Sequence, residues 1–293
     1  VGRIVLLVGI FAVGFWLLRY QSSQSHALAL VNALKTSTTT GAPKIIEQMD
    51  DYRNGANPLL LELARSQNPV ESLHANMALP PQFADEKILL EGMMTATPAE
   101  FSTVRDAYRR VANPENRTSG LWVLLQDPQI TEDRRFRAAL ALADFAPPSE
   151  TSPDEKWQAV SKFLSDQLLE EIQRNPGAYE PWMHEARPLR NLLRPALEEL
   201  FLDKDGSPEN RTEAATVIGS LLDDQAETLA KLILNAEPSQ YHRLAPVLRK
   251  LGSTGQSALE SAYSKALVNE SKPLDVYVES RRRKGAAAIA LLE

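Results

Sequence analysis

An alanine-rich phrase recurs along the chain and narrows the folds that it can adopt. Its copies read LHANMAL, FRAALAL, EAATVI and GAAAIAL, and they end at Leu79, Leu142, Ile218 and Leu291. The intervals between these ends are therefore 63, 76 and 73 residues. A unit of about 70 residues holds about four short helices, or two antiparallel helix pairs.

A second pair of matching phrases supports the same interpretation. Residues 96–108 read ATPAEFSTVRDAY and residues 236–248 read AEPSQYHRLAPVL, at an offset of 140. The matched residues are Ala96 and Ala236, Pro98 and Pro238, Phe101 and Tyr241, and Val104 and Leu244. Because a single helix pair cannot bury its apolar face, neighbouring pairs stack and share a core. We therefore predict an all-α fold, a HEAT-like α-solenoid of short antiparallel helix pairs in a right-handed stack. A compact irregular helical bundle is the alternative, because the repeat lengths vary.

Apolar residues at helical spacing predict about fourteen to seventeen short helices, and no run of alternating β-branched residues indicates a sheet. We expect one of these helices to begin after Pro58 and another to cover 276–292. The Pro/Ser-rich stretch APPSETSP, residues 146–153, is the strongest break in the pattern. It divides the helical-repeat region into a first half, residues 21–146, and a second half, residues 154–293.

The stretch from Ile4 to Leu18 contains no charged residue. As a helix it would span about 22 Å, short of the roughly 30 Å of a bilayer core, and the stems of Arg3 and Arg19 would extend it. Trp16 and Tyr20 have the amphipathic rings that favour the membrane interface. We predict that the lipid bilayer is a partner of this stretch and that it forms one transmembrane helix.

Two alternatives compete with a retained anchor over residues 1–20. One is a buried core helix, and the other is a signal peptide cleaved near Ser25-His26-Ala27. The next Lys or Arg after Arg19 is Lys35, so the downstream flank is poor in basic residues. By the positive-inside rule, we expect a single-pass protein of the cell membrane with the residues after Tyr20 on the extracytoplasmic side.

The charge balance argues against nucleic acid as a partner. The chain has a formal net charge of −6, so without Arg3 and Arg19 the remainder carries −8. Its dense basic run, Arg281 to Lys284, leads into an alanine-rich segment and is typical of a solvated helix start. The absence of cysteine excludes disulfides, thiolate metal sites and cysteine nucleophiles.

No pattern of polar residues predicts a catalytic, cofactor-binding or metal site. His184-Glu185 begins like a zinc-protease motif, but Pro188 stands where the second histidine is needed. The other histidines, His26, His74 and His242, are far apart in the chain. Two short segments, Asp203 to Gly206 and Gly252 to Gly255, are typical of turns. Two carboxylate pairs, Glu170-Glu171 and Glu198-Glu199, are typical of solvated helix faces. We predict no cofactor, and an enzyme would require a cleft with convergent titratable groups.

Three N-x-S/T sequons occur, at Asn116, Asn210 and Asn269. Two of them read NRT and precede apolar-periodic residues, so we expect Asn or Thr of each to act as a helix N-cap.

Aromatic side chains decide between two non-catalytic roles. Exposure of Trp122, Trp157, Trp182 or Tyr179 on one concave face would favour binding of a protein or peptide partner or self-association, whereas burial would favour a spacer.

Several phrases, in this order after the apolar stretch, resemble one family: KIIEQMDDYRNGANPLLLEL, SLHANMALPP, GLWVLLQDPQITEDRRFRAALALADFAP, PWMHEARPLRNLLRPALEELFLD and RRRKGAAAIALLE. The family is that of bacterial receptor-type serine/threonine protein kinases, which often carry a C-terminal formylglycine-generating (sulfatase-modifying) enzyme domain. The resemblance covers residues 27–293 and implies the region beyond the membrane anchor of a longer protein. No kinase motif occurs in this chain, so the resemblance transfers no catalytic residue. The alternatives are a secreted or membrane-anchored scaffold protein unrelated to kinases, and a membrane-bound hydrolase.

Overall fold

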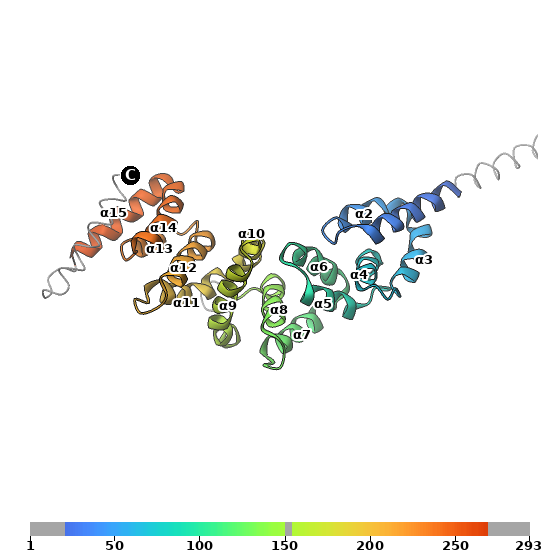
Figure 1. Cartoon of the computed structure of the whole chain (residues 1–293), viewed down its shortest axis with the longest axis horizontal. Helices are drawn as coiled ribbons and strands as arrows, with labels where there is room; N and C mark the ends of the chain where they lie inside the picture. Colours follow the sequence, from blue (N-terminus) through green and yellow to red (C-terminus); the bar gives the residue numbers. More distant parts are fainter. Residues whose placement is uncertain (1–20, 150–153, 269–293) are drawn as a thin grey trace, which may run out of the picture. The chain divides into compact units, whose positions relative to one another are not determined.

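The computed structural model describes residues 21–149 and 154–268. These residues form helices joined by short connections, and no strand occurs among them. The predicted all-α fold class is therefore confirmed for this part of the chain (Figure 1). The chain divides into two compact units, Val1–Ile130 and Thr131–Glu293, which are described separately.

In the first unit, a helix covers residues 21–36 and six further α-helices follow. Helix α4 packs against α2, α3, α5 and α6, and it buries His74, Ala75, Asn76, Met77 and Ala78. The phrase LHANMAL therefore forms the central helix of this unit. The elements are α2 (Ala42–Gln48), η1 (Asp50–Tyr52), α3 (Arg53–Leu63), α4 (Pro69–Ala78), α5 (Glu86–Thr95), α6 (Pro98–Val111) and α7 (Pro114–Gln126).

In the second unit, two further copies of the alanine-rich phrase lie on α8 and α12. Residues 138–143 of α8 are all buried, and α12 packs against α9, α10, α11 and α14. The elements are α8 (Glu132–Phe145), α9 (Glu155–Arg174), η2 (Pro176–Ala178), α10 (Tyr179–Ala186), η3 (Arg187–Leu189), α11 (Arg190–Leu202), α12 (Pro208–Leu221), α13 (Ala226–Ile233), α14 (Pro238–Lys250) and α15 (Gly252–Val268). Small side chains let these helices approach their neighbours closely.

The repeat at an offset of 140 corresponds to two helices with the same start. Helices α6 and α14 each begin with proline, and the third residue of each helix accepts a hydrogen bond from the backbone N–H of the N-cap residue. The Thr97 N–H lies 3.2 Å from Glu100 Oε2, and the Glu237 N–H lies 2.8 Å from Gln240 Oε1. The matched residues Ala96 and Ala236, Phe101 and Tyr241, and Val104 and Leu244 are all buried.

Two expectations about helix starts are wrong. Helix α3 begins at Arg53, so Pro58 lies inside it and does not start it. Asn116 and Asn210 lie within the first turns of α7 and α12, whose N-caps are Asn113 and Ser207. In α7 and in α12 the N-cap residue precedes a proline at the first helical position. Proline lacks a backbone N–H, but an N–H at this position would have no partner within the helix.

The predicted membrane anchor, Ile4 to Leu18, and the predicted helix over 276–292 lie outside the described residues. Within the described part of the chain, no helix combines the length and apolar character that a bilayer-crossing helix needs. The predicted break at residues 146–153 falls between α8 and α9, within the second compact unit. The division into residues 21–146 and 154–293 stays a prediction.

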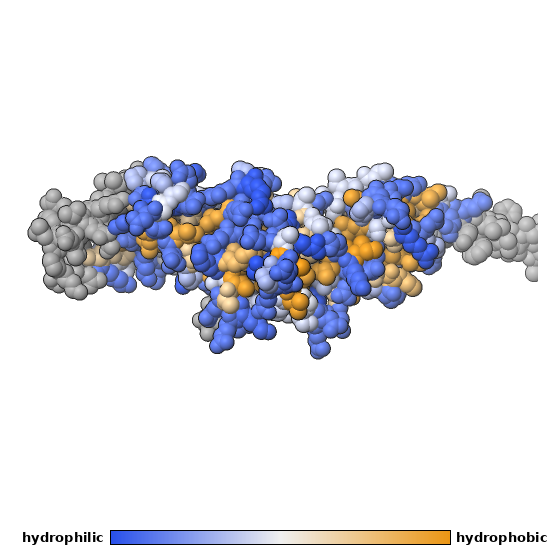
Figure 2. Space-filling view, turned by 60° about the horizontal axis from the view of Figure 1, so that its bottom comes forward, coloured by the Kyte–Doolittle hydropathy of each residue, from blue (hydrophilic) through white to orange (hydrophobic). Residues whose placement is uncertain are grey.

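Most of the face in Figure 2 is hydrophilic, with hydrophobic residues in separate groups. The large apolar side chains that are exposed come from different helices and one loop: Leu28, Leu61, Val70, Phe83, Val123 and Leu202. Scattered exposed apolar residues are normal on a protein surface, and by themselves they do not mark an interface.

Candidate functional site

The histidines do not come together. His26 stacks on Tyr52 with ring centroids 5.3 Å apart, and His184 and His242 are exposed on α10 and α14. His74 is fully buried in α4. No group of three or more possible ligands occurs among the described residues, so these side chains form no metal site there.

His74 belongs to a buried polar network in the first unit. Its Nδ1 lies 3.1 Å from the Leu34 carbonyl oxygen, and its Nε2 lies 3.2 Å from Thr39 Oγ1. A carbonyl oxygen only accepts, so Nδ1 carries a proton and donates it to Leu34, and the Thr39 hydroxyl is the partner of Nε2. Burial raises the pKa of the neighbouring Glu100 carboxyl, but hydrogen bonds from Thr97 and Thr39, together with the His74 charge, lower the pKa below its ordinary value overall.

This arrangement resembles a hydroxyl, imidazole and carboxylate set, but it has no access for a substrate. Thr39 is 6% exposed and His74 is 0% exposed. Each polar atom of the imidazole has a partner from another segment of the same unit. The network therefore joins the helix at residues 21–36 to α4, as a buried polar group in a core must have its hydrogen bonds satisfied.

The second unit contains a buried charged cluster on α8, α9 and α10. The Glu171 carboxylate accepts from Trp182 Nε1 at 3.3 Å and from Arg174 Nη1 at 2.8 Å. Arg137 lies over the Trp182 ring, 5.5 Å from its centroid, and burial lowers the pKa of the Arg137 guanidinium. Phe136 meets the same ring edge to face. The rings of Phe136 and Trp182 pack beside the charged groups of Arg137 and Glu171. The cluster therefore stabilises the junction of α8, α9 and α10.

Of the two motifs that we interpreted as turns, only Asp203 to Gly206 has that geometry, because Gly252 to Gly255 form the first turn of α15. Asp203 Oδ1 accepts from the Asp205 N–H in the connection that follows α11, which is an Asx turn. Gly252 has φ +57° between α14 and α15, a conformation that glycine adopts most readily.

The aromatic residues that would favour binding are mostly enclosed. Trp157 and Trp182 are buried, and Trp122 and Tyr179 are half-buried. The Tyr179 hydroxyl lies 3.2 Å from the Thr216 carbonyl oxygen and 2.5 Å from Ser220 Oγ, so it links α10 to α12. Burial raises the pKa of Tyr179 above its ordinary value. These side chains act chiefly in packing.

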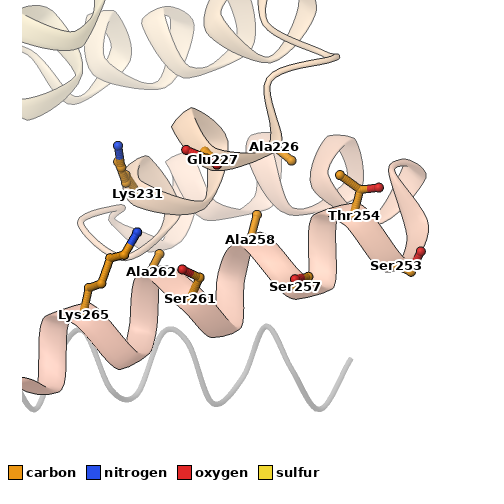
Figure 3. Close-up of a pocket in the computed structure, with 10 residues that line it drawn as sticks. All are labelled: Ala226, Glu227, Lys231, Ser253, Thr254, Ser257, Ala258, Ser261, Ala262 and Lys265. Atoms are coloured by element: carbon orange, nitrogen blue, oxygen red, sulfur yellow. The ribbon is translucent and has the colours of Figure 1, made fainter.

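A groove lies between α13 and α15 in the second unit. Its volume is about 580 Å³, within the roughly 300–1,000 Å³ of ligand sites. Figure 3 shows α15 running along one side of it, with α13 on the other. The lining residues are small or polar: Ala226, Glu227, Lys231, Ser253, Thr254, Ser257, Ala258, Ser261, Ala262 and Lys265.

Local structure places these residues. The positive φ of Gly252 turns the chain from α14 into α15, and Gly255 then lies against the backbone of α14. A β-carbon at Gly255 would lie 2.2 Å from the Leu248 carbonyl oxygen, so only glycine permits this approach. Leu259 is buried one turn later, which directs the neighbouring residues Ala258 and Ala262 toward the groove. Sequence reasoning missed this groove, because no motif marks it.

No protein-family model and no curated protein matches this chain. Among solved structures, it is similar at 14% identity to a chain described under "Computational Design of Self-Assembling Cyclic Protein Homooligomers", over 93% of each chain. The TM-score of that match is 0.17, which is too low to support an argument about fold or assembly.

Proposed function

We propose that this chain is a non-catalytic, membrane-anchored helical-repeat region that binds a protein or peptide, or holds attached domains apart. The proposal is carried by the equivalence of α6 and α14, which share the proline start, the returned hydrogen bond to the N-cap and the buried positions. Repeated helices of this kind favour a HEAT-like α-solenoid, in which each pair buries its apolar face against the next. Such stacks present rigid surfaces to partners.

The polar clusters support a structural role over a catalytic one. The hydrogen bonds of His74, Glu171 and Tyr179 run to neighbouring helices of the same unit. A catalytic group must instead meet a substrate within hydrogen-bond reach. On this ground we favour a scaffold over a hydrolase.

The proposed membrane topology can be tested because the chain has no cysteine. We would introduce Glu62→Cys on α3 and, separately, Gln256→Cys on α15, both at exposed positions. A membrane-impermeant maleimide added to intact bacterial cells should label both variants in the membrane fraction if the helices are extracytoplasmic. Labelling only after lysis would reverse the orientation, and recovery of the protein in the soluble fraction would exclude the anchor.

We further propose that the parent protein is a bacterial receptor-type serine/threonine kinase, on the resemblance described above. The coding sequence upstream of Val1 tests this directly. A protein-kinase domain there supports the proposal. Any other upstream domain leaves the alternative of a scaffold unrelated to kinases.

A further inference from the structure

The groove between α13 and α15 is rich in hydrogen-bond donors that the described residues leave unused. The hydroxyls of Ser257 and Ser261 make no hydrogen bond to a described residue, and Lys231 and Lys265 form no ion pair with one. Other polar side chains of the same helix have partners within it. The Ser264 hydroxyl donates to the Glu260 carbonyl oxygen at 2.8 Å, and Gln256 Nε2 donates to Glu260 Oε1 at 3.0 Å.

The spacing of the groove residues is regular. Ser253, Ser257, Ser261 and Lys265 follow one another at intervals of four residues, which places them about 6 Å apart along α15. An extended peptide repeats every two residues, or about 6.7 Å, so alternate carbonyl groups can meet successive donors. From Ser253 to Lys265 the helix rises about 18 Å, which is the length of about five extended residues.

The charges set the chemistry of the occupant. Two ammonium groups, Lys231 and Lys265, line the groove against one carboxylate, Glu227, in a chain whose net charge is −6. Figure 3 shows Lys265 reaching from α15 toward α13, where Lys231 lies. A locally basic, donor-rich groove complements a ligand that supplies carbonyl oxygens and negative charge.

We propose that the α13–α15 groove binds an extended peptide of about five residues that carries carboxylate side chains. The backbone carbonyls accept from the serine hydroxyls, and the carboxylates pair with Lys231 and Lys265. This inference deepens the proposed function, since it gives the repeat region a defined class of partner. The cysteine-labelling test of topology does not depend on it, so the two can fail separately.

The test measures fluorescence anisotropy of a labelled Ala-Glu-Ala-Glu-Ala peptide with the full chain in detergent micelles. The matched control peptide has glutamine in place of each glutamate. We expect the glutamate peptide to bind about tenfold more tightly than the control, a preference that weakens as salt is raised. Equal binding of the two peptides, or no saturable binding, would overturn the proposal.

Variants assign the binding to the groove. The double variant Lys231→Gln, Lys265→Gln should weaken the glutamate peptide about tenfold, and Ser257→Ala with Ser261→Ala should weaken it severalfold. Ser264→Ala is the matched control on the same helix and should leave binding unchanged. If the groove variants behave like Ser264→Ala, the peptide binds elsewhere and the proposal is wrong.

Two further measurements separate other occupants. Inorganic phosphate should compete only weakly, and displacement of the peptide at equal concentration would identify a small-anion site instead.

A cysteine introduced at Ser257 should react with maleimide as fast as one at Ser264, since both positions are exposed. A slower reaction at position 257 at every protein concentration would mean that another part of the same chain fills the groove. A slower reaction at high protein concentration alone would mean that a second copy of the chain fills it. Either result would overturn the proposal.

Discussion

The His74 imidazole donates a hydrogen bond from Nδ1 to the Leu34 carbonyl oxygen, 3.1 Å away and 40 residues earlier in the chain. This bond joins the end of the helix over residues 21–36 to the central helix α4. The Thr39 hydroxyl satisfies the other ring nitrogen at 3.2 Å. One buried side chain therefore bonds to two segments of the first unit.

Replacing His74 with alanine should destabilise the first unit by about 2–4 kcal/mol, because it removes two buried hydrogen bonds and leaves a cavity in the core. The free energy of unfolding can be measured by circular dichroism in urea. His184→Ala is the control, since His184 is exposed on α10 and its loss should change stability by less than about 0.5 kcal/mol. Equal effects of the two substitutions would contradict the assigned role.

Gly255 and Gly120 should respond to alanine in opposite directions. Both lie within helices, where alanine is favoured over glycine by about 1 kcal/mol. A β-carbon at Gly120 meets no atom within 4 Å, so Gly120→Ala should stabilise. The β-carbon of Gly255→Ala would overlap the Leu248 carbonyl oxygen, and we expect a loss of about 1–3 kcal/mol. Thermal unfolding midpoints distinguish the two, and a stabilised Gly255→Ala variant would show that α14 and α15 are not packed this closely.

Asn113 and Asn116 test where α7 begins. The Asn113 side chain accepts from the backbone N–H of Glu115 at 3.0 Å, whereas Asn116 is exposed inside the helix. Asn113→Ala should therefore cost about 1 kcal/mol, and Asn116→Ala should be nearly neutral. Hydrogen exchange of the amides of residues 115–117 provides a local readout. Faster exchange in Asn116→Ala than in Asn113→Ala would place the cap at the sequon instead.

Tyr108 should make stability depend on pH in the alkaline range. Burial, with a further contribution from the nearby Glu86 carboxylate, raises the pKa of Tyr108 to about 12, compared with about 10 for an unfolded tyrosine. Between these values the unfolded chain loses a proton that the folded chain retains, so the free energy of unfolding falls as the pH rises from about 10 to about 12. Urea midpoints across this range should fall less steeply for Tyr108→Phe than for the native chain. Identical slopes would show that Tyr108 ionises normally.

The helical character and the repeats could be predicted from the sequence, because they depend on local patterns. The proline that begins α6 and the proline that begins α14 each follow a capping residue, and the apolar positions recur every three or four residues. Each of these signals acts within one helix. Phe101 and Tyr241, which match at an offset of 140, are both buried.

Helix α3 shows where local rules fail. Pro58 is a start signal by itself, yet it lies inside a helix that begins at Arg53. Arg53 Nη1 donates to the Ala78 carbonyl oxygen at 2.6 Å, and Gly55 lies against Gln24 and Ala27 of the preceding helix. These tertiary contacts hold the turn before the proline in helical form, and they offset the loss of one backbone hydrogen bond.

The sequence by itself determined that the chain is helical, repetitive and without a catalytic motif, since these properties depend on residue type and spacing. Only the tertiary structure decided that His74 is a satisfied core residue and that the serines of α15 face a groove. The PENRT phrase shows the physical reason. It occurs at the start of α7 and of α12, but Arg117 donates to the Arg109 carbonyl oxygen, whereas Arg211 pairs with Glu237. Identical local sequence gives the same helix start, but the partner of a long side chain depends on which helix lies beside it.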